Sequence, residues 1–255
     1  MRKQKRVVLN GIQWIKRVIG LSLCFLCQIS VAQVPFFERY YTHPGVDICF
    51  SVSQLNDSSV YLFGYSENGS IGGYDFSLMK VKPDGTPCWT KYYGTPQVDF
   101  GLFMNNADSS NLILIGTTQN LNPGLADDVL LIKVDSAGQV IWSQVIGSFG
   151  NESCRYVEQT ADKGFICCGV TPDPFGYNDA WVVKTDSLGN VEWTNIFGGV
   201  DNDVAARVVA TSPSTWAMTC DTKVAGNGSY DVQVIGLDAG GNQTFDHIHA
   251  DSLTN

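Results

Sequence analysis

Short apolar runs alternate with turn-forming residues along most of the chain. In the middle of the sequence, four strand-like runs follow one another at residues 129–134, 140–146, 154–159 and 164–169. Polar, glycine-containing stretches at residues 135–138, 147–150 and 161–164 separate them, as is typical of tight turns. No segment keeps a helical apolar period over eleven residues. The pattern therefore predicts an all-β fold of short antiparallel strands.

This pattern recurs in units of about 52 residues. An Asp leads each unit, with a Lys place, a Gly, a Trp and a second Gly at fixed distances of 5, 10, 14 and 19 residues behind it. The fourth copy keeps the frame in a weaker form, with Phe245 at the Trp place and Gly236 at the Lys place. The shared structural positions are Asp75, Gly85, Trp89, Asp128, Gly138, Trp142, Asp179, Gly189, Trp193, Asp231, Gly241 and Phe245.

The frame extends backwards to the start of the chain. Ten residues after each Trp comes an acid, and a glycine place follows seventeen residues later. By the same spacing Phe37 takes the Trp place, Asp47 the acid place and Gly64 the glycine place. The repeats, with units beginning near Phe37 and at the four leading Asp residues, therefore occupy residues 33–255.

Four strands in a unit of this length predict a β-propeller of four-stranded blades, because one blade cannot bury its apolar faces alone. A β-solenoid is the structural alternative, although its units are usually shorter and hold fewer strands.

The turn before each Trp carries a family resemblance. Residues 133–142, Lys-Val-Asp-Ser-Ala-Gly-Gln-Val-Ile-Trp, and residues 184–193 resemble the tryptophan-docking motif of quinoprotein-dehydrogenase-like propellers. The chain is more similar still to the secreted propeller-repeat proteins of Bacteroidota, over about residues 37–250. That resemblance implies that Asp and Gly form the turn while Trp packs between blades. It also implies export, often with a C-terminal sorting domain for type IX secretion.

The register at the two ends favours an incomplete propeller over a closed four-bladed ring. Residues 37–42 and 245–250 both supply the Trp-type strand, so closure would duplicate it. Asn255 falls where the acid of another half-unit would come. We therefore expect missing C-terminal repeats or a sorting domain, with the complete small ring as the alternative.

Residues 1–32 have the three parts of a secretory signal peptide. Six bases and no acid precede or flank an apolar run that begins at Val18, and Ser30-Val31-Ala32 offers a small-residue cleavage site. The run is shorter than the about 20 residues needed to cross a bilayer. Lipidation at Cys24 or Cys27 is a lesser alternative, because Leu precedes both. We expect a secreted or cell-surface protein with no membrane span after cleavage.

Charge narrows the range of partners. The signal segment holds six of the 16 basic residues and none of the 25 acidic ones, so the repeat region is strongly acidic. Its remaining bases are scattered. Such a field repels phosphate backbones, which argues against a nucleic-acid partner.

Six cysteines remain after the signal peptide, at positions 49, 88, 154, 167, 168 and 220. Export permits disulfides, and a bridge between Cys154 and Cys168 on consecutive strands is one possibility. Alternation places Cys167 and Cys168 on opposite sheet faces, which argues against a bridge between these neighbours. The other interpretation is that all six are small buried hydrophobic residues.

Motifs for catalysis are absent from the repeat region. It contains no CxxC, HExxH or GxSxG, and no cofactor or metal site is predicted. His247 and His249 could form half of a metal site, but His249 takes an apolar place in the frame. The leading Asp residues and their neighbours Tyr74, Asp127, Asn178 and Tyr230 could line an acidic rim, although side-chain bonds to turn backbone explain the Asp residues equally well.

Together these features favour an exported, non-catalytic binding or display module whose ligand is a glycan or a protein. A quinone-dependent oxidoreductase or other propeller enzyme, and a structural spacer in a large adhesin, are the alternatives.

Overall fold

The computed structural model describes residues 38–41, 44–69, 71–119, 126–148, 150–223 and 230–249. The chain divides into two units, Met1–Phe37 and Glu38–Asn255. The expected signal peptide, residues 1–32, and Phe37 lie outside the described residues. The part of the chain that is described holds no helix long and apolar enough to cross a membrane.

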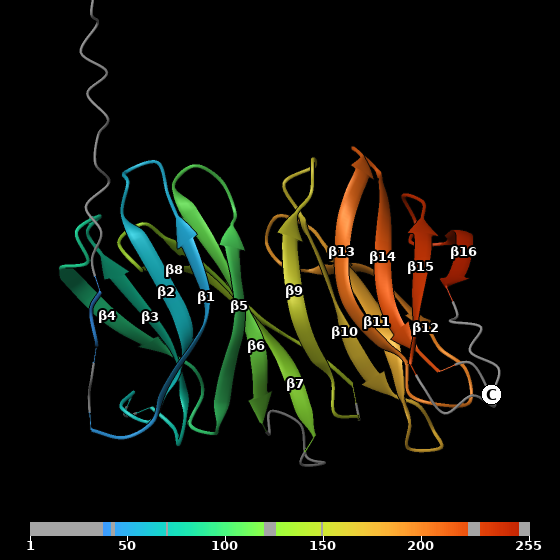
Figure 1. Cartoon of the computed structure of the whole chain (residues 1–255), viewed down its shortest axis with the longest axis horizontal. Coiled ribbons are helices and arrows are strands. Elements are labelled where there is room, and N and C mark those ends of the chain that lie inside the picture. Colours follow the sequence, from blue (N-terminus) through green and yellow to red (C-terminus); the bar gives the residue numbers. More distant parts are fainter. Residues whose placement is uncertain are drawn as a thin grey trace, which may run out of the picture. The chain divides into compact units, whose positions relative to one another are not determined.

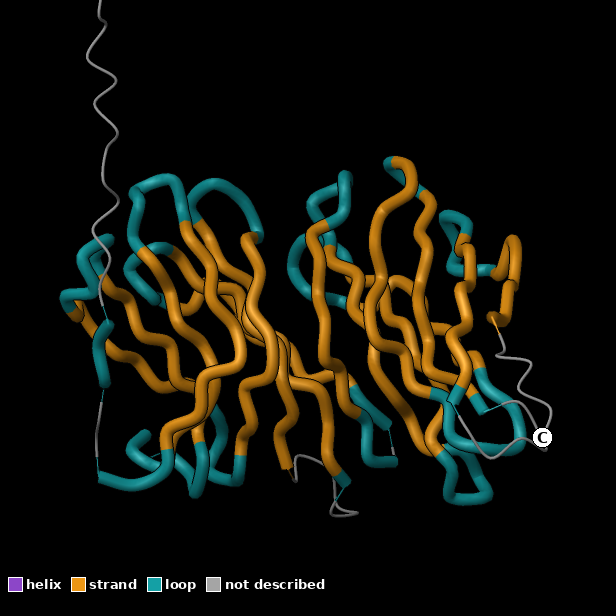
Figure 2. Tube along the Cα trace, viewed as in Figure 1, coloured by secondary structure: helices purple, strands orange, loops and turns teal. Residues whose placement is uncertain are grey.

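Sixteen strands form the described part of the second unit (Figures 1 and 2). The strands are β1 (Asp47–Gln54), β2 (Val60–Ser66), β3 (Asp75–Val81), β4 (Pro87–Tyr93), β5 (Asp99–Asn106), β6 (Asn111–Gln119), β7 (Asp127–Asp135), β8 (Val140–Ile146), β9 (Ser153–Gln159), β10 (Phe165–Pro172), β11 (Asn178–Thr185), β12 (Val191–Phe197), β13 (Val204–Ser212), β14 (Thr215–Thr222), β15 (Asp231–Leu237) and β16 (Gln243–His249). They form four sheets of four consecutive antiparallel strands. The predicted all-β fold of four-stranded propeller blades is confirmed.

Each sheet joins the end of one sequence unit to the start of the next. In the second sheet, β5 begins at the acid place, Asp99, while β7 carries the leading Asp128 and β8 carries Trp142. A sequence unit that begins at a leading Asp therefore supplies the two outer strands of one blade and the two inner strands of the following blade.

The first strand of every sheet lies on the inside of the row of sheets. Strands β1, β5, β9 and β13 contact one another in that order, whereas β4, β8, β12 and β16 lie at the far edges. Figure 1 shows the sheets following one another in sequence order. Among the described elements, extensive contacts join consecutive sheets only, so the four blades form an open row and not a ring.

Apolar side chains fill the space between neighbouring sheets. We call the face of a sheet that points to the next sheet its front face, and the opposite face its rear face. The three cores contain Phe63 and Leu78 against Leu114 and Ile132, then Ile115 and Leu131 against Cys167 and Val183, then Cys168 and Val182 against Met218 and Ile235. Because successive strand residues point to opposite faces, each middle sheet contributes to two cores.

A glycine turn on each of the second, third and fourth sheets receives a tryptophan from the sheet before it. Gly138 has a φ of 73°, which an L side chain rarely adopts. Asp135 closes this turn by accepting hydrogen bonds from the backbone N–H groups of Ala137 and Gln139, at 2.9 and 2.8 Å. A Cβ on Gly138 would come within 2.8 Å of the Trp89 ring, so only glycine fits beneath it.

The same docking recurs along the row. Trp142 Nε1 donates to the carbonyl of Ser187 at 3.1 Å, and Trp193 Nε1 donates to the carbonyl of Ala239 at 3.0 Å. Each acceptor lies in the turn of the following sheet. The tryptophans therefore tie each blade to the next one.

Candidate ligand-binding site on the inner strands

A hollow of about 710 Å³ runs across the inner strands of the first three sheets. The residues that line it are Phe50, Tyr65, Phe100, Leu102, Thr117, Asp127, Asn151, Glu152, Ser153, Arg155, Val170 and Asn178. They come from the inner strands β1, β5 and β9, from the loop before β9, and from β2, β6, β7, β10 and β11. One wall is aromatic and another is polar, a combination that is typical of small-molecule sites.

Three aromatic rings, those of Phe50, Tyr65 and Phe100, form the first wall, and Tyr74 packs against two of them from outside the lining. Tyr65 lies at the centre, with its ring centroid 5.8 Å from that of Phe50, 5.3 Å from that of Tyr74 and 5.0 Å from that of Phe100. Tyr74 and Phe100 are 5.5 Å apart. The Phe50 side chain is 56% exposed, so an apolar ring surface faces solvent at the hollow. Such a surface is available to a ligand without moving the fold.

The polar wall is formed at the junction of the second and third sheets. Asn151 Oδ1 accepts a hydrogen bond from the backbone N–H of Asp127 at 2.9 Å, which fixes its amide plane. Burial raises the pKa of the half-buried Asp127 carboxyl. Arg155 and Asn178 are exposed on the same lining. The wall therefore offers carboxylate, amide and guanidinium groups within one hollow.

Glu152 lies at the bottom of this wall and is only 1% exposed. Its backbone N–H donates to the carbonyl of Asp127 at 2.8 Å, a bond that links the third sheet to the second. Its Oε1 accepts hydrogen bonds from the hydroxyls of Ser148 and, at 3.3 Å, Thr171. Oε2 is buried and has no hydrogen-bond partner among the described residues. A buried acceptor in this state costs about 1–3 kcal/mol, which a donor from a ligand or a water would offset.

The leading Asp residues are not among the residues that line the hollow. The Asp75 carboxylate accepts hydrogen bonds from the backbone N–H groups of Ile71 and Gly72, both at 3.1 Å. A Cβ on Gly198 would lie 1.9 Å from Asp179 Oδ1, so that glycine leaves room for the carboxylate. Asp75 therefore holds its turn, and the residues directly before Asp128 and Asp179 line the hollow instead.

The sequence pattern did not indicate three residues of the hollow, Tyr65, Phe100 and Arg155. Asp127 and Asn178 could be found there, because they precede the leading Asp residues in the repeat. No repeat position marked the aromatic residues, which come from two different sheets.

The structure does not bring Cys154 and Cys168 together. Cys154 and Cys167 share the core between the second and third sheets, whereas Cys168 belongs to the next core. The strand register explains this arrangement, because Cys168 pairs with Tyr156 and a register shift follows directly before Gly169 pairs with Cys154. All six described cysteines are free thiols, and burial raises the pKa of Cys154 and Cys168 well above the ordinary value. The expected Cys154–Cys168 bridge does not fit this geometry.

The two histidines lie on the outermost strand of the fourth sheet, β16, and both are exposed. Within the described ranges, no three His, Cys, Asp or Glu side chains gather closely enough to hold a metal ion.

No protein-family model matches the sequence, and no curated protein matches it at a significant level. Among solved structures, the chain is similar to the WD40 domain of Pan2 from Neurospora crassa, with a TM-score of 0.45 and 12% sequence identity. That match covers 80% of this chain and 67% of the Pan2 chain.

Proposed function

We propose that the protein is an exported, non-catalytic binding module that holds a glycan in the inner-strand hollow. The observation that carries this proposal is the exposed aromatic wall of Phe50, Tyr65 and Phe100, which shares a hollow with the polar side chains of Asp127 and Asn178.

A sugar ring suits both walls. Its C–H faces are apolar and can lie flat on an aromatic ring, while its hydroxyls can each donate and accept hydrogen bonds. Carboxylate, amide and guanidinium groups recognise such hydroxyls, because they present fixed acceptors and donors in one plane. The unpaired Glu152 Oε2 gives a buried acceptor for a bridging water.

Export is supported by the sequence alone, through the basic, apolar and small-residue parts of residues 1–32. The acidic repeat region disfavours anionic ligands, so we expect a neutral or basic glycan.

The test is binding of the purified chain to a glycan array, followed by titration of the best ligand. The substitution Phe50→Ala should weaken binding about ten-fold. It removes a stacking contact with the ligand and the apolar area that the ligand would bury, which together contribute more than about 1 kcal/mol. Phe175→Ala is the matched control, since Phe175 is 86% exposed and does not line the hollow. It should bind like the unmodified chain.

Absence of saturable binding across a broad array would reject the glycan ligand. Saturable binding to a protein ligand, weakened by Phe50→Ala, would instead support the protein-ligand alternative. Dye-linked oxidation of alcohols or sugars on addition of quinone and calcium would favour the enzyme alternative and contradict a purely binding role.

A further inference from the structure

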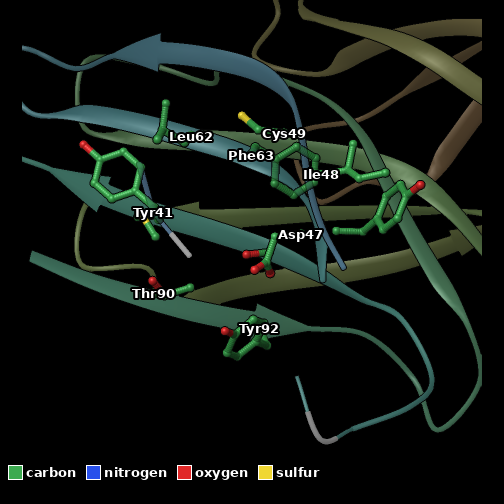
Figure 3. Close-up of a pocket in the computed structure, with 12 residues that line it drawn as sticks. Tyr41, Asp47, Ile48, Cys49, Leu62, Phe63, Thr90 and Tyr92 are labelled. Atoms are coloured by element: carbon green, nitrogen blue, oxygen red, sulfur yellow. The ribbon is translucent and has the colours of Figure 1, made fainter. Parts of the chain in front are cut away.

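The rear face of the first sheet carries a second hollow, of about 140 Å³, that shares only Tyr65 with the lining of the inner-strand site. Figure 3 shows Leu62 beside the ring of Tyr41 and Cys49 farther along, near Phe63, with Thr90 and Tyr92 on the outer strand below them. Met79 also lines the hollow. No sheet packs on this face among the described elements, so apolar side chains remain open to solvent.

The equivalent positions in the other three sheets are buried against a preceding sheet. Leu62 corresponds in the repeat to Leu114, Cys167 and Met218, and Met79 corresponds to Ile132, Val183 and Ile235. All six are buried in the cores between sheets. The rear face of the first sheet therefore has a sequence suited to packing against a preceding sheet.

Part of that preceding sheet is already in place. Tyr41 Oη donates to the carbonyl of Gly85 at 2.8 Å, just as Tyr93 Oη, from the outer strand of the first sheet, donates to the carbonyl of Gly138 at 2.9 Å. Tyr41 and Tyr93 both lie four residues after the Trp place of the repeat. Segment Glu38–Tyr41 therefore contacts the first sheet as the outer strand of a preceding blade would.

A second contact repeats in the same way. Arg39 Nε donates to the carbonyl of Asp84 at 3.3 Å, and Gln144 Nε2 donates to the carbonyl of Leu188 at 3.3 Å. Arg39 and Gln144 each lie two residues after the Trp place, and both acceptors directly precede a turn glycine. Two independent side chains thus assign the same place in the fold to Glu38–Tyr41.

We propose that the rear face of the first sheet binds a three-stranded antiparallel sheet, supplied by further repeats of the same polypeptide, and that Glu38–Tyr41 forms its fourth strand. The three existing interfaces between sheets show the chemistry of the partner, which would present apolar side chains like those of Phe63 and Leu78. Its third strand would have an unpaired edge, and Glu38–Tyr41 would occupy that edge by strand addition.

A second copy of the chain fits this face less well. The fourth sheet already has its own outer strand, β16, which would fall where Glu38–Tyr41 lies. Its front face also replaces Phe63 of the first sheet by Thr219 at the same repeat position. The partner that matches the face is therefore a sheet without an outer strand.

Photo-methionine incorporated in the cells that naturally make the protein tests this proposal. Met104 and Met218 lie in cores between sheets and should cross-link to the neighbouring sheet, which gives an internal control. Met79 should cross-link within the same polypeptide, to a segment that carries the repeat but has no outer strand. Cross-links from Met79 to the fourth sheet of a second copy, to any other surface, or to nothing while Met104 and Met218 react would overturn the proposal.

Thiol labelling gives a second readout. Cys49, on the rear face, and Cys88, on the outer strand, are both exposed thiols in this structure. In the natural protein Cys49 should react at least about ten-fold more slowly than in the isolated 255-residue chain, because the matching Cys154 position is fully buried. Cys88 should react equally in both. An unchanged rate at Cys49 would show that the face is uncovered.

Discussion

The lysine five residues after the leading Asp holds the turn between the two inner strands. Lys80 pairs with Asp57 at 2.7 Å, and Lys184 pairs with Asp162 at 2.8 Å. Lys184 is the most deeply placed, with its side chain 2% exposed, and it also contacts Glu192 at 2.8 Å. The Lys184 ammonium is buried, whereas both carboxylates reach solvent. Removing the carboxylates would therefore leave a buried charge without a partner, while removing the lysine would leave two solvated acids.

The pH dependence of stability should reflect this pair. Burial raises the pKa of Asp162, but hydrogen bonds from Lys184 and Thr160 outweigh that effect and lower it to about 2. A carboxyl with a lowered pKa in the folded state stabilises the fold above its unfolded pKa, and that stability is lost as pH falls through the folded pKa. Asp162→Asn should cost about 1 kcal/mol at pH 7, since exposure screens the pair.

Urea denaturation at several pH values checks this prediction. The difference between Asp162→Asn and the unmodified chain should disappear between about pH 4 and pH 2. Asp201→Asn, in the loop before β13, is the control for loss of one carboxylate. A difference that stayed constant down to pH 2 would contradict the assigned role of the ion pair.

The strands and turns could be predicted from the sequence because each is set by local chemistry. Alternating apolar residues define a strand, and an Asp followed by a glycine with positive φ, as at Asp135 and Gly138, defines the turn. The grouping of strands into sheets could not be read from the repeat, since no residue marks which strand is innermost. The partner of Cys154 was also beyond prediction, because the register shift beside Cys168 decides it.

The docking of tryptophan on a glycine turn predicts unequal costs for two glycine substitutions. Gly138→Ala strains a positive φ and brings a Cβ within 2.8 Å of the Trp89 ring, whereas Gly176→Ala strains a φ of 92° and meets no atom within 4 Å. We expect Gly138→Ala to cost about 1–2 kcal/mol more than Gly176→Ala in free energy of unfolding. Equal costs would mean that the tryptophan contact adds little.

The aromatic residues of the hollow come together only when neighbouring sheets pack against each other. Tyr65 and Phe100 belong to the first and second sheets, and their rings approach to 5.0 Å because β2 and β5 lie side by side. No local pattern indicates that approach. The sequence could therefore predict the blade architecture and part of the polar wall, but not the aromatic wall that suggests the ligand class.

Residues at equivalent repeat positions also contribute differently to stability, according to the place of their sheet in the row of sheets. Val129 and Val232 both follow a leading Asp, yet Val129 is fully buried between sheets and Val232 is 50% exposed on the open front face of the fourth sheet. Val129→Thr should cost about 1–2 kcal/mol because it buries a hydroxyl. Val232→Thr should change stability by less than about 0.5 kcal/mol. Thermal or urea unfolding of the two variants would measure this contrast, and a large cost at Val232 would indicate that the face is covered in solution.

Sheets that contact only their neighbours in sequence also set an order of assembly. A chain built in this way can fold one blade at a time, each on the surface of the blade before it, with no need to wait for distant segments. Segment Glu38–Tyr41 is the exception, because it contacts the Gly85 turn without a strand partner among the described residues and would pair only when the sheet proposed above assembles.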